Sequence, residues 1–172
     1  MSDYIRDLER KLKRPYPVNQ IKWREGHKGK MLAHIDARDV MNRLDAVFGI
    51  SGWQAGFEFI GERMVCTIAC KIEDEWISKA DGAGDTNVEP EKGGLSKALV
   101  RAAVPWGIGR YLYHTKAFDN NRNPASWATP EGYDALLEER EKASVVKLHK
   151  TETNDDSKEG SKEGSKSKKG TD

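Results

Sequence analysis

The 172-residue chain has only two cysteines, so a disulfide framework is excluded and a reducing compartment is expected. It lacks any apolar run near the roughly 18 residues that a membrane helix needs. Its first residues, MSDY, do not form a signal-peptide pattern. We therefore expect a cytoplasmic protein without a membrane partner. The chain also has no Gly-x-x-x-x-Gly-Lys-Ser/Thr motif and so gives no sign of nucleotide hydrolysis.

The chain also lacks an excess of charge of one sign, because it contains 29 Lys and Arg and 28 Asp and Glu. This balance excludes a wholly basic, histone-like protein. The charges are nevertheless unevenly distributed. Residues 92–116 carry five Lys or Arg and no acidic residue, whereas residues 49–91 carry three Lys or Arg and nine Asp or Glu. Cations interleaved with aromatic residues are typical of single-stranded nucleic-acid binding. The open alternative is a solvated cationic helix whose aromatic side chains lie in the core.

Apolar periodicity predicts helices over residues 3–13, 89–104 and 130–143, and another between Asp36 and Gly49. Asp36 is the expected N-cap of that helix, and Gly49 is its expected stop. In the helix over 89–104, the predicted core stripe consists of Leu95, Ala98, Leu99 and Ala102. The Lys- and Gly-rich segment from Ile21 to Lys30 is predicted to be a loop.

Between these helices, alternation with a period of two predicts a three-stranded antiparallel meander. The residues expected on the inward face of each strand are Trp53, Ala55, Phe57 and Phe59, then Met64, Cys66, Ile68, Cys70 and Ile72, then Trp76, Ser78 and Ala80. The predicted class is therefore α+β, with a β-β-β-α core flanked by helices.

Catalytic and metal chemistry finds little support in the sequence. The two cysteines alternate onto one strand face, and the four histidines are scattered, so we interpret the cysteines as core thiols and expect no cofactor. Carboxylates beside a lysine, between Glu73 and Lys79, leave a metal-dependent nuclease as one alternative.

Three segments taken together resemble the Rad-fifty-two single-strand annealing family, particularly its short phage and bacterial members of the Sak and DdrA-like types. They are HIDARDVMNRLDAVFGISGW (34–53), VCTI (65–68) and EKGGLSKALVRAAVPWGIGRYLY (91–113). The resemblance covers roughly residues 20–115. It implies a homo-oligomeric ring that holds single-stranded DNA in a basic groove with the bases exposed for pairing.

The resemblance implies an ATP-independent recombinase for DNA repair that is not an enzyme. Lys92 and Arg101 match basic positions of the family, while Val100 and Val104 stand where eukaryotic members carry cations. Arg38 lies near the basic residue of the first family helix. The predicted DNA-binding set is Lys92, Lys97, Arg101, Arg110, Arg38, Arg43, Lys30, Trp106 and Tyr111.

We expect an annealing domain over residues 1–145. A disordered polar tail is expected over 146–172, and it could recruit a single-strand-binding protein. Besides the nuclease, a general RNA- or DNA-binding domain without annealing activity stays open as an alternative.

Overall fold

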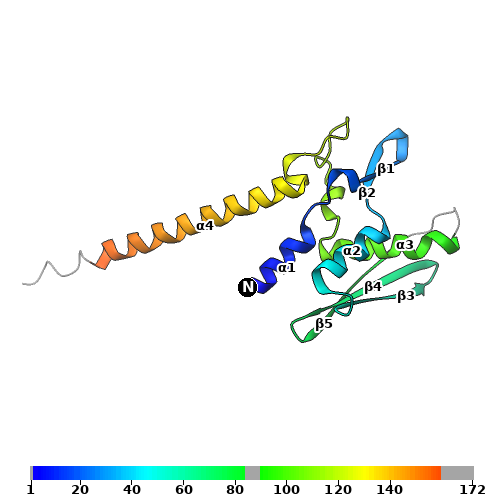
Figure 1. Ribbon diagram of the computed structural model, residues 1–172, viewed down its shortest axis with the longest axis horizontal. Coiled ribbons are helices and arrows are strands. Elements are labelled where there is room, and N and C mark those ends of the chain that lie inside the picture. Colours follow the sequence, from blue (N-terminus) through cyan, green and yellow to red (C-terminus); the bar gives the residue numbers. More distant parts are fainter. Residues whose placement is uncertain (1, 84–89, 160–172) are drawn as a thin grey trace, which may run out of the picture. The chain divides into compact units, whose positions relative to one another are not determined.

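The structure is a computed structural model that describes residues 2–83 and 90–159. The chain divides into two units, Met1–Tyr133 and Asp134–Asp172. The first unit is built around a three-stranded antiparallel sheet with helices, which confirms the predicted α+β class and its meander (Figure 1). Within the described residues, no helix has the length and apolar character needed to cross a membrane.

Helices α1 (Asp3–Lys13) and α2 (Ala37–Phe48) lie where the periodicity predicted them. The carboxylate of Asp36 accepts hydrogen bonds from the first turn of α2, and the Asp39 carboxylate accepts one from the Asp36 N–H. This reciprocal capping box fixes the start of α2. The helix ends at Gly49, whose φ of 72° lies in the left-handed region that favours glycine.

The segment predicted to be a loop forms most of a β-hairpin instead. Strand β1 (Lys22–Glu25) pairs antiparallel with β2 (Met31–His34), so that Trp23 lies opposite Ala33. Strands of four residues are too short to show a clear alternation, and the connection between them has the composition of a loop. The sequence pattern therefore missed both strands.

An ion pair joins this hairpin to α2. The Lys22 ammonium binds the Asp36 carboxylate and lies 3.5 Å from an oxygen of Asp39. The hydrogen bond from Lys22 lowers the pKa of Asp36 to about 2. The same carboxylate thus caps α2 and anchors β1.

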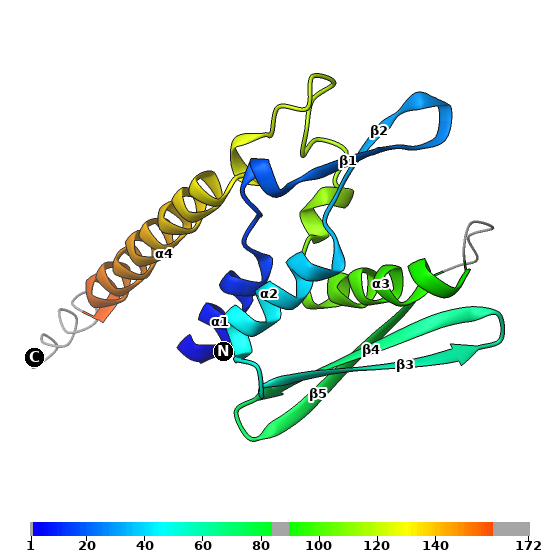
Figure 2. The ribbon, with the colours of Figure 1, turned by 45° about the vertical axis from the view of Figure 1, so that its right-hand side comes forward.

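The main sheet consists of β3 (Trp53–Ile60), β4 (Arg63–Ile72) and β5 (Glu75–Ala83), in that order. The register places Cys70 of β4 opposite Trp53 on β3 and opposite Ile77 on β5. Directly opposed residues point to the same side of a sheet. Helices α2 and α3 lie on this side of the sheet (Figure 2).

The face predicted for β5 is wrong by one residue. A two-residue turn pairs Ile72 with Glu75, so Lys79 and Asp81 point to the helix side, as Ile77 does. A shift of one position moves every side chain of a strand to the other face. The residues expected on the helix side, Trp76, Ser78 and Ala80, therefore lie on the opposite face.

Helix α3 (Pro90–Ala103) packs against β4 and β5 through Ala98, Leu99 and Ala102, as predicted. Leu95 was expected in the same stripe, but its side chain is 45% exposed. Gly94, and not Leu95, faces the sheet at this turn, where a Cβ would lie 3.9 Å from the Cβ of Met64.

The two cysteines lie beneath α3 as free, fully buried thiols, which confirms the interpretation as core residues. Burial raises the pKa of Cys66 to about 11 and that of Cys70 to about 12. Both side chains therefore remain uncharged thiols near neutral pH.

After α3 the chain turns through the 3₁₀ helices η3 (Val104–Trp106) and η4 (Arg110–Tyr113). Gly107 and Gly109 have φ values of 96° and 66°, which supply the left-handed conformations around the fully buried Ile108. A further 3₁₀ helix, η5 (Ser126–Ala128), follows the loop that comes after η4.

Helix α4 (Pro130–Glu159) is longer than the helix predicted over 130–143. It continues into the segment expected to be a tail, of which residues 160–172 lie outside the described part of the chain. The division into a domain over 1–145 and a polar tail over 146–172 stays a prediction.

Candidate nucleic-acid interface

A groove of about 560 Å³ separates the β1–β2 hairpin from the chain that follows α3. The hairpin forms one wall of this groove. Val100 and Val104 line it from α3 and η3, and η4 and the loop after it complete the opposite wall. The walls therefore come from segments about eighty residues apart in the sequence, joined only by the fold.

Among the charged side chains of the groove, basic ones outnumber acidic ones. Arg24 and Lys30 line it from the hairpin, and Arg122 lines it from the opposite loop. The acidic residue among the described lining residues is Asp119. With three cations and one carboxylate, the lining carries an excess of positive charge, which favours binding of a polyanion such as a nucleic-acid backbone.

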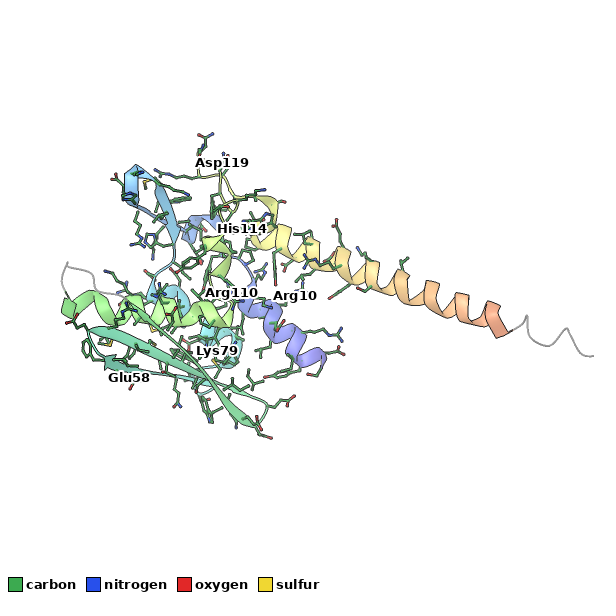
Figure 3. The ribbon with its side chains drawn as sticks, turned by 180° about the vertical axis from the view of Figure 1, so that it is seen from behind. Arg10, Glu58, Lys79, Arg110, His114 and Asp119 are labelled. Atoms are coloured by element: carbon green, nitrogen blue, oxygen red, sulfur yellow. The ribbon has the colours of Figure 1, made fainter. Side chains whose placement is uncertain are left out.

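The Asp119 carboxylate is occupied within its own loop. It accepts hydrogen bonds from the backbone N–H groups of Asn121 and Asn123, both at 2.8 Å, and from the Asn123 side-chain amide at 3.0 Å. These bonds lower the pKa of Asp119, with the Asn123 side chain contributing most. The carboxylate thus shapes the loop that carries Arg122. Figure 3 labels Asp119 together with His114, which lines the same wall.

Aromatic side chains line the same space. The rings of Trp23 and Phe118 meet edge to face at 5.1 Å, and the guanidinium of Arg122 lies 5.5 Å from the Trp23 ring. These contacts join the hairpin to the opposite loop. Tyr113, in contrast, lines the groove with 65% of its surface exposed.

Of the predicted DNA-binding residues whose side chains the structure describes, Lys30 is the one that lines the groove. Helix α3 turns Val100 towards it, whereas the next residue, Arg101, points to β5. There the Arg101 guanidinium pairs with the carboxylate of Asp81 at 3.1 Å. Lys97 lies exposed on α3, and the side chain of Lys92 lies outside the described part.

Trp106 and Arg110 lie in the 3₁₀ helices η3 and η4, which follow α3. Arg110 donates to the carbonyls of Val104 at 2.9 Å and of Pro105 at 2.7 Å, and Lys79 donates to the same Pro105 carbonyl at 3.1 Å. These hydrogen bonds join the side chains of Arg110 and Lys79 to the backbone of η3. The Trp106 ring is 5% exposed and lies below the Lys79 ammonium, 4.6 Å away, so the predicted base stacking on Trp106 does not fit this geometry.

Arg43 and Tyr111 are also built into the interior. Arg43 donates to the carbonyls of Lys11 at 2.8 Å and Arg14 at 2.6 Å, at the end of α1, and lies 4.3 Å from the ring centre of Tyr16. The Tyr111 hydroxyl accepts the Tyr16 N–H at 3.1 Å, and burial raises the pKa of this hydroxyl. Neither side chain points to the groove, because both hold other elements together. Arg38 is exposed at the start of α2.

The sequence prediction did not include Arg24, Arg122 and Tyr113 among the site residues. A signal existed for Tyr113, which lies in the segment without acidic residues. Arg24 lies in a cationic segment, KWREGHKGK, that was interpreted as a loop. Nothing in the local sequence marks Arg122, because its position depends on the contact with Trp23.

Comparison with known proteins gives two kinds of match. Residues 4–66 and 64–127 match the model of the Rad52/22 family double-strand break repair protein, and these segments contain every residue that lines the groove. A protein of Deinococcus deserti named single-stranded DNA-binding protein DdrA is 32% identical over 146 residues, or 74% of this chain and 72% of that protein. A protein of the same name from Deinococcus radiodurans is 32% identical over 117 residues, covering 63% of this chain and 56% of that protein.

Proposed function

The chain belongs to the Rad52/22 family of double-strand break repair proteins, and from this premise we propose that it binds single-stranded DNA and anneals complementary strands without ATP. The observation that carries the proposal is the cationic groove between the β1–β2 hairpin and the wall that follows α3. The name shared by the two Deinococcus relatives, single-stranded DNA-binding protein, supports the choice of ligand.

The groove supplies what strand annealing needs. Arg24, Lys30 and Arg122 contact phosphates, which all nucleotides share, so binding does not depend on sequence. Neutralised phosphates reduce the repulsion between two approaching strands. Base pairing then provides the specificity and the free energy, so no nucleotide hydrolysis is required. The exposed Lys97 on α3 extends the contact beyond the groove.

We also propose that several copies assemble into a ring through the sheet edge. Strand β3 lies at the edge of the main sheet, and Phe57, Phe59 and Ile60 on it are 42%, 71% and 58% exposed. Exposed apolar side chains beside unpaired backbone groups favour association. The polar segment over 146–172 is the proposed contact for a single-strand-binding protein.

The test replaces the three groove cations. A second triple variant, with the same change in net charge outside the groove, serves as the control. The variant R24Q/K30Q/R122Q is compared with R6Q/K11Q/K71Q, whose three cations lie outside the groove in exposed ion pairs. Fluorescence anisotropy with labelled oligonucleotides at several salt concentrations measures affinity. We expect the groove variant to bind weakly, with a salt slope lower by about 2, since each phosphate contact contributes about 0.7 on single strands.

Annealing of complementary oligonucleotides, with EDTA and without nucleotide, is measured on the same proteins. We expect wild type and the control variant to anneal, and the groove variant to fail. Equal losses in both triple variants would place the site elsewhere. Tight binding without annealing by the wild type would instead identify a general nucleic-acid-binding domain.

A further inference from the structure

Tyr113 stands apart from the other aromatic residues of the groove. Trp23 and Phe118 are half-buried against one another, and Trp23 also lies against Arg122. The Tyr113 ring is 65% exposed, and no hydrogen bond or ring contact joins its side chain to another described residue. Its face is therefore accessible to a ligand in the groove.

Tyr111, in the same turn, has a structural role. Tyr111, two residues earlier in η4, is half-buried, and its hydroxyl accepts the N–H of Tyr16. The short turn of η4 thus directs one tyrosine into the fold and the other towards the groove. Burial of a large aromatic side chain is favourable, and the exposed ring of Tyr113 does not gain this free energy in the monomer. A ligand ring that covered Tyr113 would recover part of that free energy.

Resting on the proposed function, we propose that Tyr113 stacks on the face of an unpaired base while Arg24, Lys30 and Arg122 hold the adjacent phosphates. Stacking uses the π-face of a base and leaves its pairing edge free, so it is compatible with annealing. In a duplex both faces of an internal base are already covered by its neighbours. Tyr113 therefore contributes to the preference for single strands, which phosphate contacts alone do not provide.

The size of the groove agrees with this assignment. A volume of about 560 Å³ lies within the roughly 300–1,000 Å³ of sites that accept small organic molecules. The backbone of η4 carries Tyr113, and Tyr111 and Arg110 anchor that turn to Tyr16 and to η3. A ring on an anchored turn loses little freedom when a base stacks on it.

The experiment compares variants at Tyr113 on two ligands, an oligo-dT and an oligonucleotide of the same length made of abasic residues. Both carry the same phosphates, but only one has bases to stack. We expect Y113A to bind oligo-dT roughly 5- to 150-fold more weakly, the range that alanine substitution gives for aromatic–base stacking. Y113F retains the ring and should bind like wild type, whereas Y113L keeps apolar bulk without a π-face and should resemble Y113A.

On the abasic ligand, wild type and all three variants should bind with the same affinity. Quenching of 2-aminopurine placed in the oligonucleotide reports stacking directly, and it should be lost in Y113A and Y113L. Thermal melting and native mass check that fold and assembly are unchanged, and Y111F serves as the control for the buried tyrosine. An equal loss on both ligands, or no loss on oligo-dT, would overturn the assignment. Failure of wild type to bind either ligand would overturn the proposed function itself.

Discussion

At the scale of single residues, Arg43 and Arg38 lie on the same helix with different surroundings. The Arg43 guanidinium is half-buried, donates to carbonyls at the end of α1 and lies over the Tyr16 ring. Burial lowers the pKa of this guanidinium, but its carbonyl and aromatic partners compensate for the buried charge. Arg38 is exposed in the first turn of α2. Both were predicted to bind DNA, yet only Arg38 presents its cation to solvent.

The prediction from this contrast concerns stability. Arg43→Ala should lower the free energy of unfolding by about 2 kcal/mol, because hydrogen bonds to a charged group contribute about 1.5–3 kcal/mol and the α1 carbonyls would lose their donor. Arg38→Ala should change it by less than about 0.5 kcal/mol. Urea denaturation of both variants, followed by circular dichroism, measures the difference. Equal stability of the two variants would mean that Arg43 does not join α1 to α2.

At the scale of elements, the turn between α2 and β3 depends on a glycine that accepts no side chain. A Cβ added to Gly52 would lie 2.1 Å from the Phe48 carbonyl oxygen, a backbone atom that cannot move without unwinding the end of α2. The Gly52 carbonyl accepts the Lys71 N–H at 2.8 Å, which sets the start of β3 beside β4. At Gly56, inside β3, an added Cβ would meet nothing within 4 Å.

We therefore expect Gly52→Ala to destabilise the protein by about 1–3 kcal/mol, the usual cost of forcing atoms into filled space. Gly56→Ala should be neutral or stabilising by up to about 1 kcal/mol, since glycine is unfavourable inside a strand. Both changes add the same methyl group, so their melting temperatures can be compared directly. Similar melting temperatures would contradict the close packing at Gly52.

The elements that the sequence predicted are those that carry local signals. The capping residues Asp36 and Gly49 mark the ends of α2, and the long strands β3 and β4 show the period of two. The β1–β2 hairpin lacks such signals because its strands have four residues each. The face of β5 depends on the residues in one turn, and a count that differs by one reverses it.

At the scale of the whole molecule, the site could be predicted only in part. The segment without acidic residues pointed to nucleic acid, but its cations are directed to several places by packing. Arg101 turns to Asp81 and Arg110 to η3, while Val100 faces the groove. Arg24 and Arg122 both line the groove, although they are far apart in the sequence. Spatial neighbours so far apart in sequence leave no periodic signal.

The last prediction concerns how much of the chain the site needs. Every residue of the main hydrophobic core and of the groove lies before residue 123, within the unit Met1–Tyr133. Residues 146–172 carry seven Lys and six Asp or Glu without an aromatic side chain, so they add little net charge and no stacking surface. We expect a chain that ends after residue 145 to keep the melting temperature, the number of subunits per assembly, the DNA affinity and the annealing rate of the full chain.

Differential scanning fluorimetry, native mass spectrometry, anisotropy and the annealing assay test this on the two chains in parallel. The full-length R24Q/K30Q/R122Q protein serves as the reference for lost DNA binding in the anisotropy and annealing assays. A shortened chain that melts normally but fails to anneal would mean that residues after 145 take part in the reaction. A smaller number of subunits, calculated from the native mass and the mass of the shortened chain, would instead place a subunit contact in them. Either result would extend the functional unit beyond the groove, since the core and the groove cations remain intact in the shortened chain.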